Sequence, residues 1–274
     1  MAKYCVILPA AGKSSRFRDF NYKKPFFFLK NRAVWLHSAR LFLNRKDVAQ
    51  VILVISPEDK EDVLEKFRAE IAVLDITLAE GGKERADSIE NAIPLIKEEC
   101  DFVCVHDAAR PCLTQALVDK VFLAAENRGA AILAVPIADS LKKVQPSDSS
   151  VRNKKKRGGG LDMLFSDPDE ECATEDGIIL ASMERGGIWY AQTPQVFRKD
   201  WFIDVYAHRN RDESAQTTDD AMLFEKAGKS VFVVEGSPCN IKITTKADLE
   251  LARAVLDALP EPKKTSFHPF SDES

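Results

Sequence analysis

The chain has 274 residues, 45% hydrophobic and 30% charged, and its 39 basic residues nearly balance 43 acidic ones, for a formal net charge of -4. This composition is typical of a globular protein, long enough for one large α/β domain or two small ones. Nothing in it favours nucleic acid or an anionic membrane as a partner, so anion binding must come from local clusters of cations. No apolar run approaches the ~20 residues that span a bilayer, and the early first strand predicts that there is no signal peptide.

Cysteine usage bears on the compartment and on metal binding. The six cysteines form no C-x-x-C pair, and several lie in apolar runs. We therefore expect reduced, buried thiols in a cytoplasmic protein. We expect no protein-held metal such as zinc, because none of the four histidines is spaced to join two cysteines.

Short apolar runs alternate with amphipathic stretches over the first half of the chain. Such alternation, at a spacing of ~20–30 residues, predicts βαβ units and a mainly parallel sheet with helices on both faces, which is an α/β fold. Strands are expected at 4–8, 51–55, 76–79, 102–105 and 130–135. Helices are expected at 33–44, at 57–69, from after Ser88 to about Glu99 with a possible kink at Pro94, and at 114–127 with Thr114 as N-cap.

The alternation stops at Pro136. We expect an exposed strand at 137–144 that pairs with a strand at 177–180 as a protruding β-arm. The intervening segment, 145–176, is poor in apolar residues and holds the basic run 152–160. That run could contact an anionic partner, but such a run is more typical of a solvated loop.

The last third of the chain returns to the body at 187–197. Helices are expected at 199–209, 219–227 and 246–258, and strands at 230–234 and 241–243. We predict one domain over residues 1–259, with the β-arm and its insertion at about 137–187. Residues 260–274 are polar and contain proline, which predicts a flexible tail.

The stretch from Tyr4 to Lys24 carries the first functional signal. An apolar strand is followed by Pro9-Ala10-Ala11-Gly12 and then by cations that include Arg16 and Lys24. Small residues let a ligand approach backbone N–H groups, and cations neutralise a polyphosphate. The stretch matches neither the P-loop nor the dinucleotide-binding pattern. An ordinary strand-to-helix turn with surface lysines would explain it equally well.

Four loops that follow strands are rich in polar residues: 9–24, 81–88, 106–111 and 240–242. Loops after parallel strands meet at one edge of a sheet, so these loops could share a cleft. That cleft would hold an excess of positive charge suited to several phosphates, and its charged residues would be Arg16, Lys24, Arg85, Arg110 and Lys242 against Asp107 and possibly Asp219.

Each of these residues also has a purely structural interpretation. Asp107 could bind a ribose or polyol hydroxyl or a hydrated Mg²⁺, or it could cap a turn. Arg110 could pair with Asp107, Arg85 could belong to a capped helix start, and Lys242 could lie on the surface. The sequence offers little support for covalent catalysis, because it has no Ser-His-Asp order and no exposed cysteine with a partner base.

Taken together, six motifs resemble the 2-C-methyl-D-erythritol 4-phosphate cytidylyltransferase family. The resemblance covers about Tyr4 to Leu256, apart from the middle insertion. The motifs are Pro9-Ala10-Ala11-Gly12 with Arg16 and Lys24, Gly81-Gly82-Lys83-Glu84-Arg85-Ala86-Asp87-Ser88, His106-Asp107-Ala108-Ala109-Arg110-Pro111, Thr193-Pro194-Gln195, Thr218-Asp219, and Asn240-Ile241-Lys242.

The resemblance implies a reaction and an architecture. CMP would pass from CTP to 2-C-methyl-D-erythritol 4-phosphate, giving 4-diphosphocytidyl-2-C-methyl-D-erythritol and pyrophosphate in non-mevalonate isoprenoid biosynthesis. The fold would be a Rossmann-like nucleotidyltransferase domain that forms a homodimer through its β-arm. CTP would be the co-substrate, Mg²⁺ would be held mainly by the CTP phosphates, and neither nucleic acid nor a membrane would be a partner.

The resemblance also implies roles for single residues. The catalytic residues would be Arg16, Lys24, Arg185 and Lys242, with Arg185 supplied by the partner's arm. The nucleotide would be held by Ala10, Ala11, Gly12, Gly82, Arg85, Ser88, Asp107 and Ala108. The acceptor phosphate would be held by Asp107, Arg110, Ser140, Arg185, Thr218 and Lys242.

Several positions depart from the family pattern. Ser14 and Ser15 replace a glycine and a basic residue, Lys83 replaces an aspartate, and Ser140 replaces a threonine. Lys24-Pro25-Phe26 stands where the family has Pro-Lys-Gln, and the arm is longer. Two alternatives stay open: a cytidylyltransferase for a pentitol phosphate such as ribitol 5-phosphate, and a non-catalytic nucleotide-binding scaffold whose basic insertion is an interaction surface.

Overall fold

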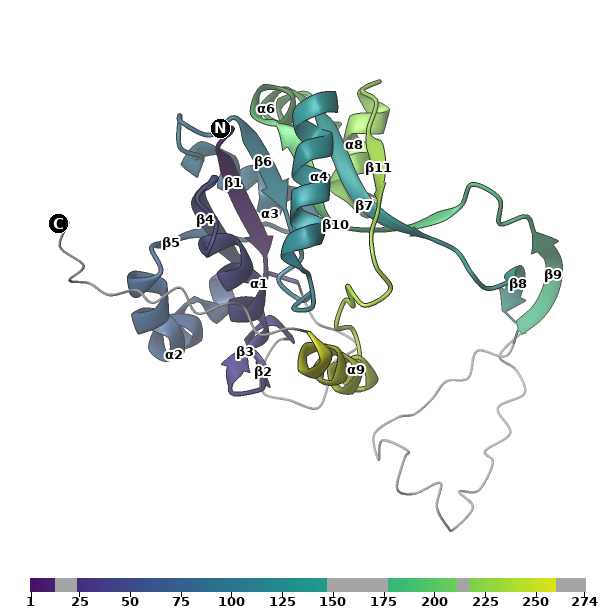
Figure 1. Ribbon diagram of the computed structural model, residues 1–274, viewed down its shortest axis with the longest axis horizontal. Coiled ribbons are helices and arrows are strands. Elements are labelled where there is room, and N and C mark those ends of the chain that lie inside the picture. The colour runs from purple at the N-terminus through teal and green to yellow at the C-terminus, as the bar shows by residue number, and fades with distance from the viewer. Residues whose placement is uncertain (13–23, 147–176, 211–216, 260–274) are drawn as a thin grey trace, which may run out of the picture.

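The structure is a computed structural model, and it describes residues 1–12, 24–146, 177–210 and 217–259. Among these residues the main sheet has seven strands in the order β11-β7-β10-β6-β1-β4-β5 (Figure 1). These strands are β1 (Tyr4–Pro9), β4 (Val48–Ile55), β5 (Ile76–Glu80), β6 (Phe102–Val105), β7 (Ala130–Pro136), β10 (Trp189–Arg198) and β11 (Phe232–Glu235).

The sheet is mainly parallel, as predicted, and β10 is the exception. β10 runs antiparallel to both β6 and β7, while the other strand pairs of this sheet are parallel. Parallel neighbours need a crossover connection, usually a helix. The chain leaves β7 through the arm and returns directly into β10, so β10 enters the sheet in the opposite direction.

Helices cover both faces of the sheet. On β1, Tyr4, Val6 and Leu8 pack on one face, and Cys5 and Ile7 pack on the other. A strand buried on both faces is expected when helices flank a parallel sheet. The first face is covered by α1 (Val34–Leu43), α2 (Lys60–Val73) and α4 (Gln115–Arg128), and the second by α3 (Arg85–Ala92), α6 (Lys199–Ala207) and α8 (Asp220–Lys226).

A third, smaller cluster forms under the last helix, α9 (Lys246–Ala258). Leu249 and Ala252 of α9 pack against Leu29 and Val34. Leu29 belongs to a small hairpin of β2 (Phe28–Leu29) and β3 (Arg32–Ala33), which the sequence analysis did not predict because each strand has only two residues. The cluster fixes the segment that precedes α9 against the body.

The helix ends follow local sequence signals. Thr114 is the N-cap of α4, as predicted, and its hydroxyl accepts a hydrogen bond from the Leu117 N–H at 3.4 Å. The helix ends at Gly129, whose φ of 85° lies in the left-handed region. At the start of α3, Glu84 and Asp87 form a reciprocal capping box.

Two predicted elements are wrong. The helix expected up to Glu99 ends at Ala92 and gives way to a 3-10 turn, η3 (Ile93–Leu95), because Pro94 has no N–H to continue the helix. Residues 241–243 form no strand. Instead the Ile243 N–H donates to the Ala109 carbonyl at 2.9 Å, which ties this segment to the loop after β6.

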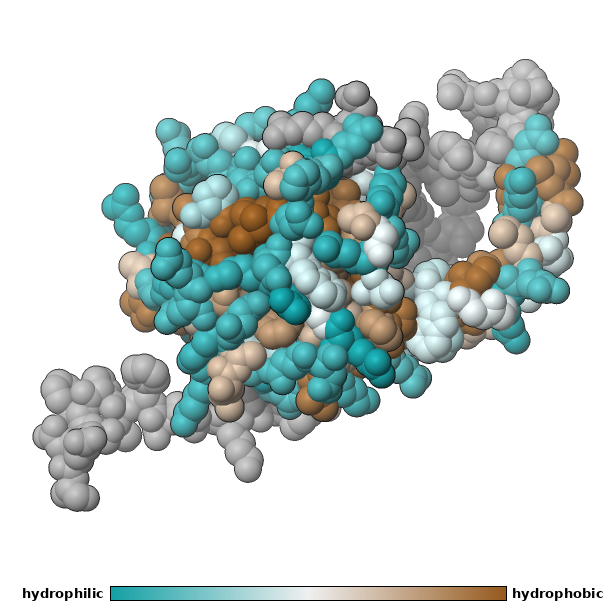
Figure 2. Space-filling view, turned by 90° about the horizontal axis from the view of Figure 1, so that it is seen from above, coloured by the Kyte–Doolittle hydropathy of each residue, from teal (hydrophilic) through white to brown (hydrophobic). Residues whose placement is uncertain are grey.

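The arm consists of β8 (Leu141–Pro146) and β9 (Gly177–Met183), which pair antiparallel and project from the body (Figure 1). β8 begins later than expected because Ile137 still bonds to the Ile188 carbonyl at the base of the arm. Apolar side chains of the arm, such as Val144 and Ile179, are exposed. Figure 2 shows hydrophobic surface on the part of the molecule that projects from the body. The basic run 152–160 and the expected tail 260–274 lie outside the described residues.

None of the helices in the described ranges has the length and apolarity needed to cross a bilayer. The longest of them, α2 and α4, have 14 residues each, whereas a span needs ~20 predominantly apolar residues. Both carry charged residues along their lengths. They therefore serve as amphipathic covers of the sheet.

We predict that Gly129→Ala destabilises the fold more than Gly228→Ala. Both glycines have positive φ, so both substitutions incur a left-handed backbone cost of about 1–2 kcal/mol. At Gly129 an added Cβ would also lie 2.5 Å from the Trp201 ring, whereas at Gly228 it would meet no atom within 4 Å. Overpacking of this kind costs a further ~1–3 kcal/mol. Equal losses in urea unfolding would contradict this account.

Candidate functional site

A pocket of about 540 Å³ opens at the carboxyl ends of the parallel strands. It is lined by residues that follow β1, β4, β5 and β6, together with the segment before α9. The structure thus brings together residues from all four polar loops of the sequence. Eight of the expected site residues line it, namely Ala10, Ala11, Gly12, Gly82, Arg85, Ser88, Asp107 and Lys242.

One wall of the pocket is formed by the loop after β4, which the sequence analysis missed. Ser56, Pro57 and Glu58 line this wall. The sequence analysis assigned residues from Pro57 onward to a charged helix, so it did not count this segment among the polar loops. The rule that loops after parallel strands converge could have found it, because Ser56 directly follows β4.

Two loops meet closely beneath the pocket. The Gly81 N–H donates to the Ile55 carbonyl at 2.7 Å, and a Cβ on Gly81 would lie 2.4 Å from the Ala11 Cβ. The Gly82 N–H donates to the Ser88 hydroxyl at 3.0 Å, and that hydroxyl donates to the Glu84 carbonyl at 3.0 Å. Only glycine fits at position 81, so the loops after β1 and β5 form a narrow slot with exposed backbone.

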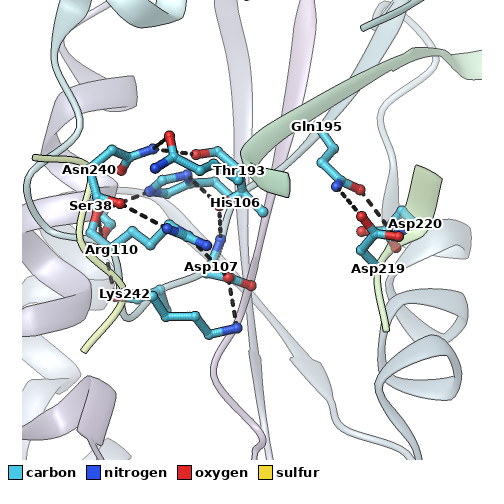
Figure 3. A network of polar contacts seen from close by, with 12 residues as sticks. Ser38, His106, Asp107, Arg110, Thr193, Gln195, Asp219, Asp220, Asn240 and Lys242 are labelled. Carbon is cyan, nitrogen blue, oxygen red and sulfur yellow. Dashed lines mark hydrogen bonds and ion pairs between the residues drawn. The ribbon is translucent and has the colours of Figure 1, made fainter. Parts of the chain in front are cut away.

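Asp107 lies at the centre of a cluster of cations (Figure 3). Its Oδ2 accepts from Lys242 Nζ at 2.9 Å and from Arg110 Nε at 3.3 Å. Burial opposes ionisation of Asp107, but the charges of Lys242, Arg85 and Arg110 outweigh it and hold the pKa of this carboxyl well below its ordinary value. Asp107 therefore stays ionised at neutral pH, and Arg110 is both its ion-pair partner and a donor to the Asn240 carbonyl at 2.8 Å.

Arg85 reaches the pocket while it is anchored from behind. Its Nη2 bonds to Oδ2 of Asp220 at 2.7 Å, and the Tyr206 hydroxyl donates to the other oxygen of Asp220 at 2.5 Å. Asp220 is fully buried, whereas the side chain of Arg85 is 25% exposed. Burial lowers the pKa of Arg85, but the neighbouring Asp220 carboxylate raises it by a larger amount, so the guanidinium stays charged.

The start of α8 is held by a single glutamine. Gln195 Oε1 accepts from the N–H groups of Asp220 and Ala221 at 3.0 Å each, and its Nε2 donates to Asp219 at 2.8 Å (Figure 3). Asp219 itself accepts from the Met222 N–H at 3.2 Å as the N-cap of α8. Asp219 thus has a structural task, and the acidic residue that faces a pocket cation is Asp220.

The remaining predicted residues do not line the pocket. Ala108 is buried and Arg110 lies behind Asp107. Ser140, Arg185 and Thr218 are exposed outside it, and the Arg185 guanidinium bonds to the Ala138 carbonyl at the base of the arm. The backbone of Lys24 forms the 3-10 turn η1 (Lys24–Phe26), and Arg16 lies outside the described residues.

The described residues include no group of three or more His, Cys, Asp or Glu side chains placed to hold a metal ion. Asp107, the buried carboxylate of the pocket, is already paired with Lys242 and Arg110. A protein-held metal centre would need more acidic ligands than these residues offer. A hydrated ion carried by a polyphosphate would fit, because its remaining ligands would be water and phosphate.

A slot of exposed backbone beside clustered cations, at the carboxyl edge of a parallel sheet, defines a nucleotide-binding α/β protein of the nucleotidyltransferase class. The family model described as 2-C-methyl-D-erythritol 4-phosphate cytidylyltransferase matches residues 4–164 and 169–258. The chain belongs to this family.

Proteins of the same name support this assignment. A relative from Clostridioides difficile (strain 630) is 31% identical over 258 residues, which cover 93% of this chain and 94% of the relative. A relative from Bacillus mycoides (strain KBAB4) is 34% identical over 257 residues, with 92% and 97% covered. The crystal structure of the enzyme from Thermus thermophilus aligns with a TM-score of 0.67 at 26% identity, covering 94% of this chain and all of that one.

We predict that Asp220→Ala destabilises the protein by about 2–3 kcal/mol, because it leaves the charge of Arg85 without its buried partner. The partial exposure of Arg85 places the loss below that of a fully buried pair. Asp204→Ala is the matched control, since Asp204 pairs with Lys229 at 3.6 Å and is 55% exposed. Urea unfolding should show a change below about 1 kcal/mol for the control. Similar losses in the two variants would contradict the assignment.

Proposed function

We propose that the protein transfers CMP from CTP to 2-C-methyl-D-erythritol 4-phosphate, giving 4-diphosphocytidyl-2-C-methyl-D-erythritol and pyrophosphate. The observation that carries this proposal is the Asp107–Lys242 pair, which lies beside Arg85 in a pocket with a glycine slot. The names of the family and of its relatives support the same reaction.

The chemistry requires positioning and positive charge. An oxygen of the acceptor phosphate attacks the α-phosphorus of CTP, a new P–O bond forms, and the bond to the β-phosphate oxygen breaks as pyrophosphate leaves. No covalent intermediate with the protein is needed, so the protein aligns the two phosphates and stabilises the charge that develops between them. We assign the second task to Lys242 and, on family resemblance, to Arg16 and Lys24.

The nucleotide would lie in the slot between the loops after β1 and β5. Ala10, Ala11, Gly12 and Gly82 expose backbone there, and Ser88 lies beneath them. The Ser88 hydroxyl proton is directed at the Glu84 carbonyl, so its free lone pair is available to accept from an amino group such as that of cytosine. We also assign Arg85, Asp107 and Ala108 to nucleotide binding, on the side of the nucleotide that carries the ribose and the phosphates.

The acceptor would lie between Asp107, Arg110 and Lys242 of one protomer, with Thr218 close to the start of α8. Ser140 and Arg185 are on the arm and outside the pocket of their own chain. Their assigned contacts with the acceptor therefore require the arm of a second copy. We accordingly propose a homodimer formed through the arms.

We propose Mg²⁺ as the metal, held mainly by the CTP phosphates. The described side chains fit this arrangement, because they offer cations for phosphate and no carboxylate cluster for the ion. When bound, the ion would neutralise part of the phosphate charge. Lys242 and Arg85, which line the pocket, would bind and orient the remaining phosphate oxygens, and Arg110 would hold Asp107 in place.

We also propose a cytoplasmic location. The cysteines of the described residues are free thiols, and most of them are buried. This is the usual state of cysteines in a reducing compartment.

We also propose the predicted domain arrangement, which is one domain over residues 1–259 followed by a tail over residues 260–274.

The deciding experiment measures pyrophosphate release by the purified protein with Mg²⁺ and CTP. Separate reactions contain 2-C-methyl-D-erythritol 4-phosphate, ribitol 5-phosphate or no acceptor. We expect release with the first acceptor and a far lower kcat/KM with the second. A preference for ribitol 5-phosphate would overturn the assigned acceptor, and binding of CTP without release in either reaction would favour a non-catalytic protein.

We predict that Lys242→Ala lowers kcat by about 100- to 1000-fold, which is the range for loss of one preorganised donor to a transition state. The matched control is Lys120→Ala, since Lys120 is exposed on α4. Steady-state pyrophosphate release and circular dichroism would be measured on both variants. A folded Lys242→Ala protein with near-normal turnover would remove Lys242 from the mechanism.

We predict that Ile179→Glu converts a dimer into monomers and lowers activity. Ile179 is 60% exposed and pairs in register with Val144, which is 50% exposed, so the two form an apolar patch on the arm. A charge in such a patch would be costly to bury between two arms. Ile203→Glu, on α6, is the control because Ile203 is 41% exposed on the body. Light scattering would measure the molecular mass of the wild type and of both variants. A wild-type protein that is monomeric and fully active would contradict the arm dimer.

A further inference from the structure

The end of α6 places one arginine against the start of α3. Arg209 lies two residues beyond Ala207, the last residue of α6, and its side chain is only 1% exposed. Its Nη2 lies 2.5 Å from Oδ1 of Asp87 and 2.6 Å from Oε2 of Glu90. A buried guanidinium needs such charged partners, because burial alone disfavours its charge.

Both carboxylates lie on one face of α3. Asp87 and Glu90 are three positions apart, which makes them neighbours on a helix, and like charges at this spacing repel each other. Burial lowers the pKa of Arg209, but its hydrogen bonds to Asp87 and Glu90 raise it by a larger amount, so the guanidinium stays charged. Arg209 therefore bridges two carboxylates that would otherwise repel, and it holds the first turns of α3 against the end of α6.

Asp87 divides its two oxygens between Arg209 and the backbone. Its Oδ2 accepts from the Glu84 N–H at 3.1 Å, which is one half of the capping box of α3. Its Oδ1 is the atom that contacts Arg209. A rotation of the Asp87 carboxylate would break both contacts, so Arg209 holds this carboxylate in the direction that caps Glu84.

The capped turn forms the floor of the nucleotide slot. A Cβ on Gly82 would lie 2.4 Å from the Cβ of Asp87, so the Gly82 backbone rests directly on Asp87. The Gly82 N–H donates to the Ser88 hydroxyl, and the Ser88 N–H donates to the Glu84 carbonyl at 3.1 Å. Gly82 and Ser88 both line the pocket. A shift of this turn would therefore move two groups that we assign to the nucleotide.

Arg209 is itself held by an aromatic ring. Its guanidinium carbon lies 5.9 Å from the centroid of the Tyr206 ring, which is within reach of a cation–π contact. The Tyr206 hydroxyl donates to Asp220, the buried partner of Arg85. The end of α6 thus supports the pocket at two places, through Tyr206 behind Arg85 and through Arg209 behind the first turn of α3.

We propose that Arg209 is a positioning residue of the nucleotide slot, because it fixes the first turn of α3 through Asp87. The fixed turn places Gly82 and Ser88 against the nucleotide. Arg209 acts through these residues, since its own side chain is buried and does not line the pocket. The consequence for nucleotide binding rests on the proposed function, whereas the fixing of the turn does not.

The binding test uses Arg209→Met, which keeps an apolar stem and removes the charge, and Arg209→Lys, which restores the charge. We expect the Kd for CTP in a calorimetric titration with Mg²⁺ to rise roughly tenfold in Arg209→Met, because CTP must then order the turn. Arg209→Lys should recover part of this loss, because an ammonium lacks the fork of a guanidinium.

Arg198→Met is the matched control for the loss of an arginine. Arg198 also pairs with a carboxylate, Asp200, and lies over an aromatic ring, that of Trp201, but its side chain is 48% exposed. Its removal should leave the Kd for CTP unchanged. An unchanged Kd in a folded Arg209→Met protein would overturn the proposal.

The two carboxylates separate positioning from the burial of charge. Asp87→Asn has one side-chain oxygen, so it cannot accept from both Arg209 and the Glu84 N–H, and it should weaken CTP binding nearly as much as Arg209→Met. Glu90→Gln leaves the capping box intact, so the Kd for CTP should change by less than about twofold. Equal losses of CTP affinity in Asp87→Asn and Glu90→Gln would contradict the proposal.

A double-mutant cycle tests whether Arg209 acts through Asp87. In an Asp87→Asn background, Arg209→Met should raise the Kd for CTP by less than about a further twofold. Independent, multiplicative losses would show that the two residues act separately and would refute the proposal. Thermal unfolding of every variant identifies those that fail to fold, and Asp87→Asn keeps the binding test valid if Arg209→Met is among them.

Steady-state kinetics provide a contrast that a general loss of folded protein would not produce. Arg209→Met should raise the KM for CTP, while kcat and the KM for the acceptor change by less than about threefold. The reason is that Asp107 and Lys242 lie on other segments of the chain. A fall in kcat with an unchanged KM for CTP would count against a role in the nucleotide slot.

A readout without substrates decides whether Arg209 fixes the turn. Arg209→Met should speed hydrogen exchange at the Glu84 amide by at least about tenfold. The Leu117 amide, which donates to the N-cap Thr114 of α4, is the internal reference and should exchange at its wild-type rate. An unchanged rate at Glu84, or equal acceleration at both amides, would overturn the proposal. If the wild type binds no CTP or releases no pyrophosphate but passes this test, the reaction assignment fails and the fixing of the turn by Arg209 stands.

Discussion

The ionised carboxylate of Asp107, held among cations, is the interaction on which the rest of the site depends. It is buried, so it is stable only because Lys242 and Arg110 contact it directly and Arg85 lies close by. Those cations come from three separate segments of the chain. Each segment is fixed by its own packing, and the segment before α9 is fixed by the small cluster under that helix. The pocket is therefore assembled by charge at its centre and by apolar packing at its margins.

The two sides of the pocket are built by different means. The nucleotide side relies on the absence of side chains, since Gly81 approaches Ala11 too closely for a Cβ. The phosphate side relies on long cationic side chains that are tethered by buried carboxylates, as Lys242 is by Asp107 and Arg85 is by Asp220. Tethering reduces the freedom that a cation must lose when phosphate binds, which is the basis of preorganisation.

Much of the fold could be predicted because strands and amphipathic helices alternate regularly, and the loops after parallel strands supply most of the pocket. The reversal of β10 could not be predicted, because a strand pattern carries no information on direction. The supports of the site were also hidden, since Asp220 reaches Arg85 across 135 positions of sequence. The strand predicted at 241–243 is wrong because an apolar alternation alone does not distinguish a strand from an extended tie to a neighbouring loop.

The arm begins and ends at one point of the body, because β7 and β10 are neighbours in the sheet. At the outer end of its described part Pro146 pairs with Gly177, so residues 147–176 start and finish at neighbouring positions. The entropy cost of closing such a loop rises by only about 0.6 kcal/mol for each doubling of its length. Chain added there leaves the register of the body and the pocket unchanged. A foreign domain or a reporter inserted between Pro146 and Gly177 should therefore leave the pocket of this chain intact.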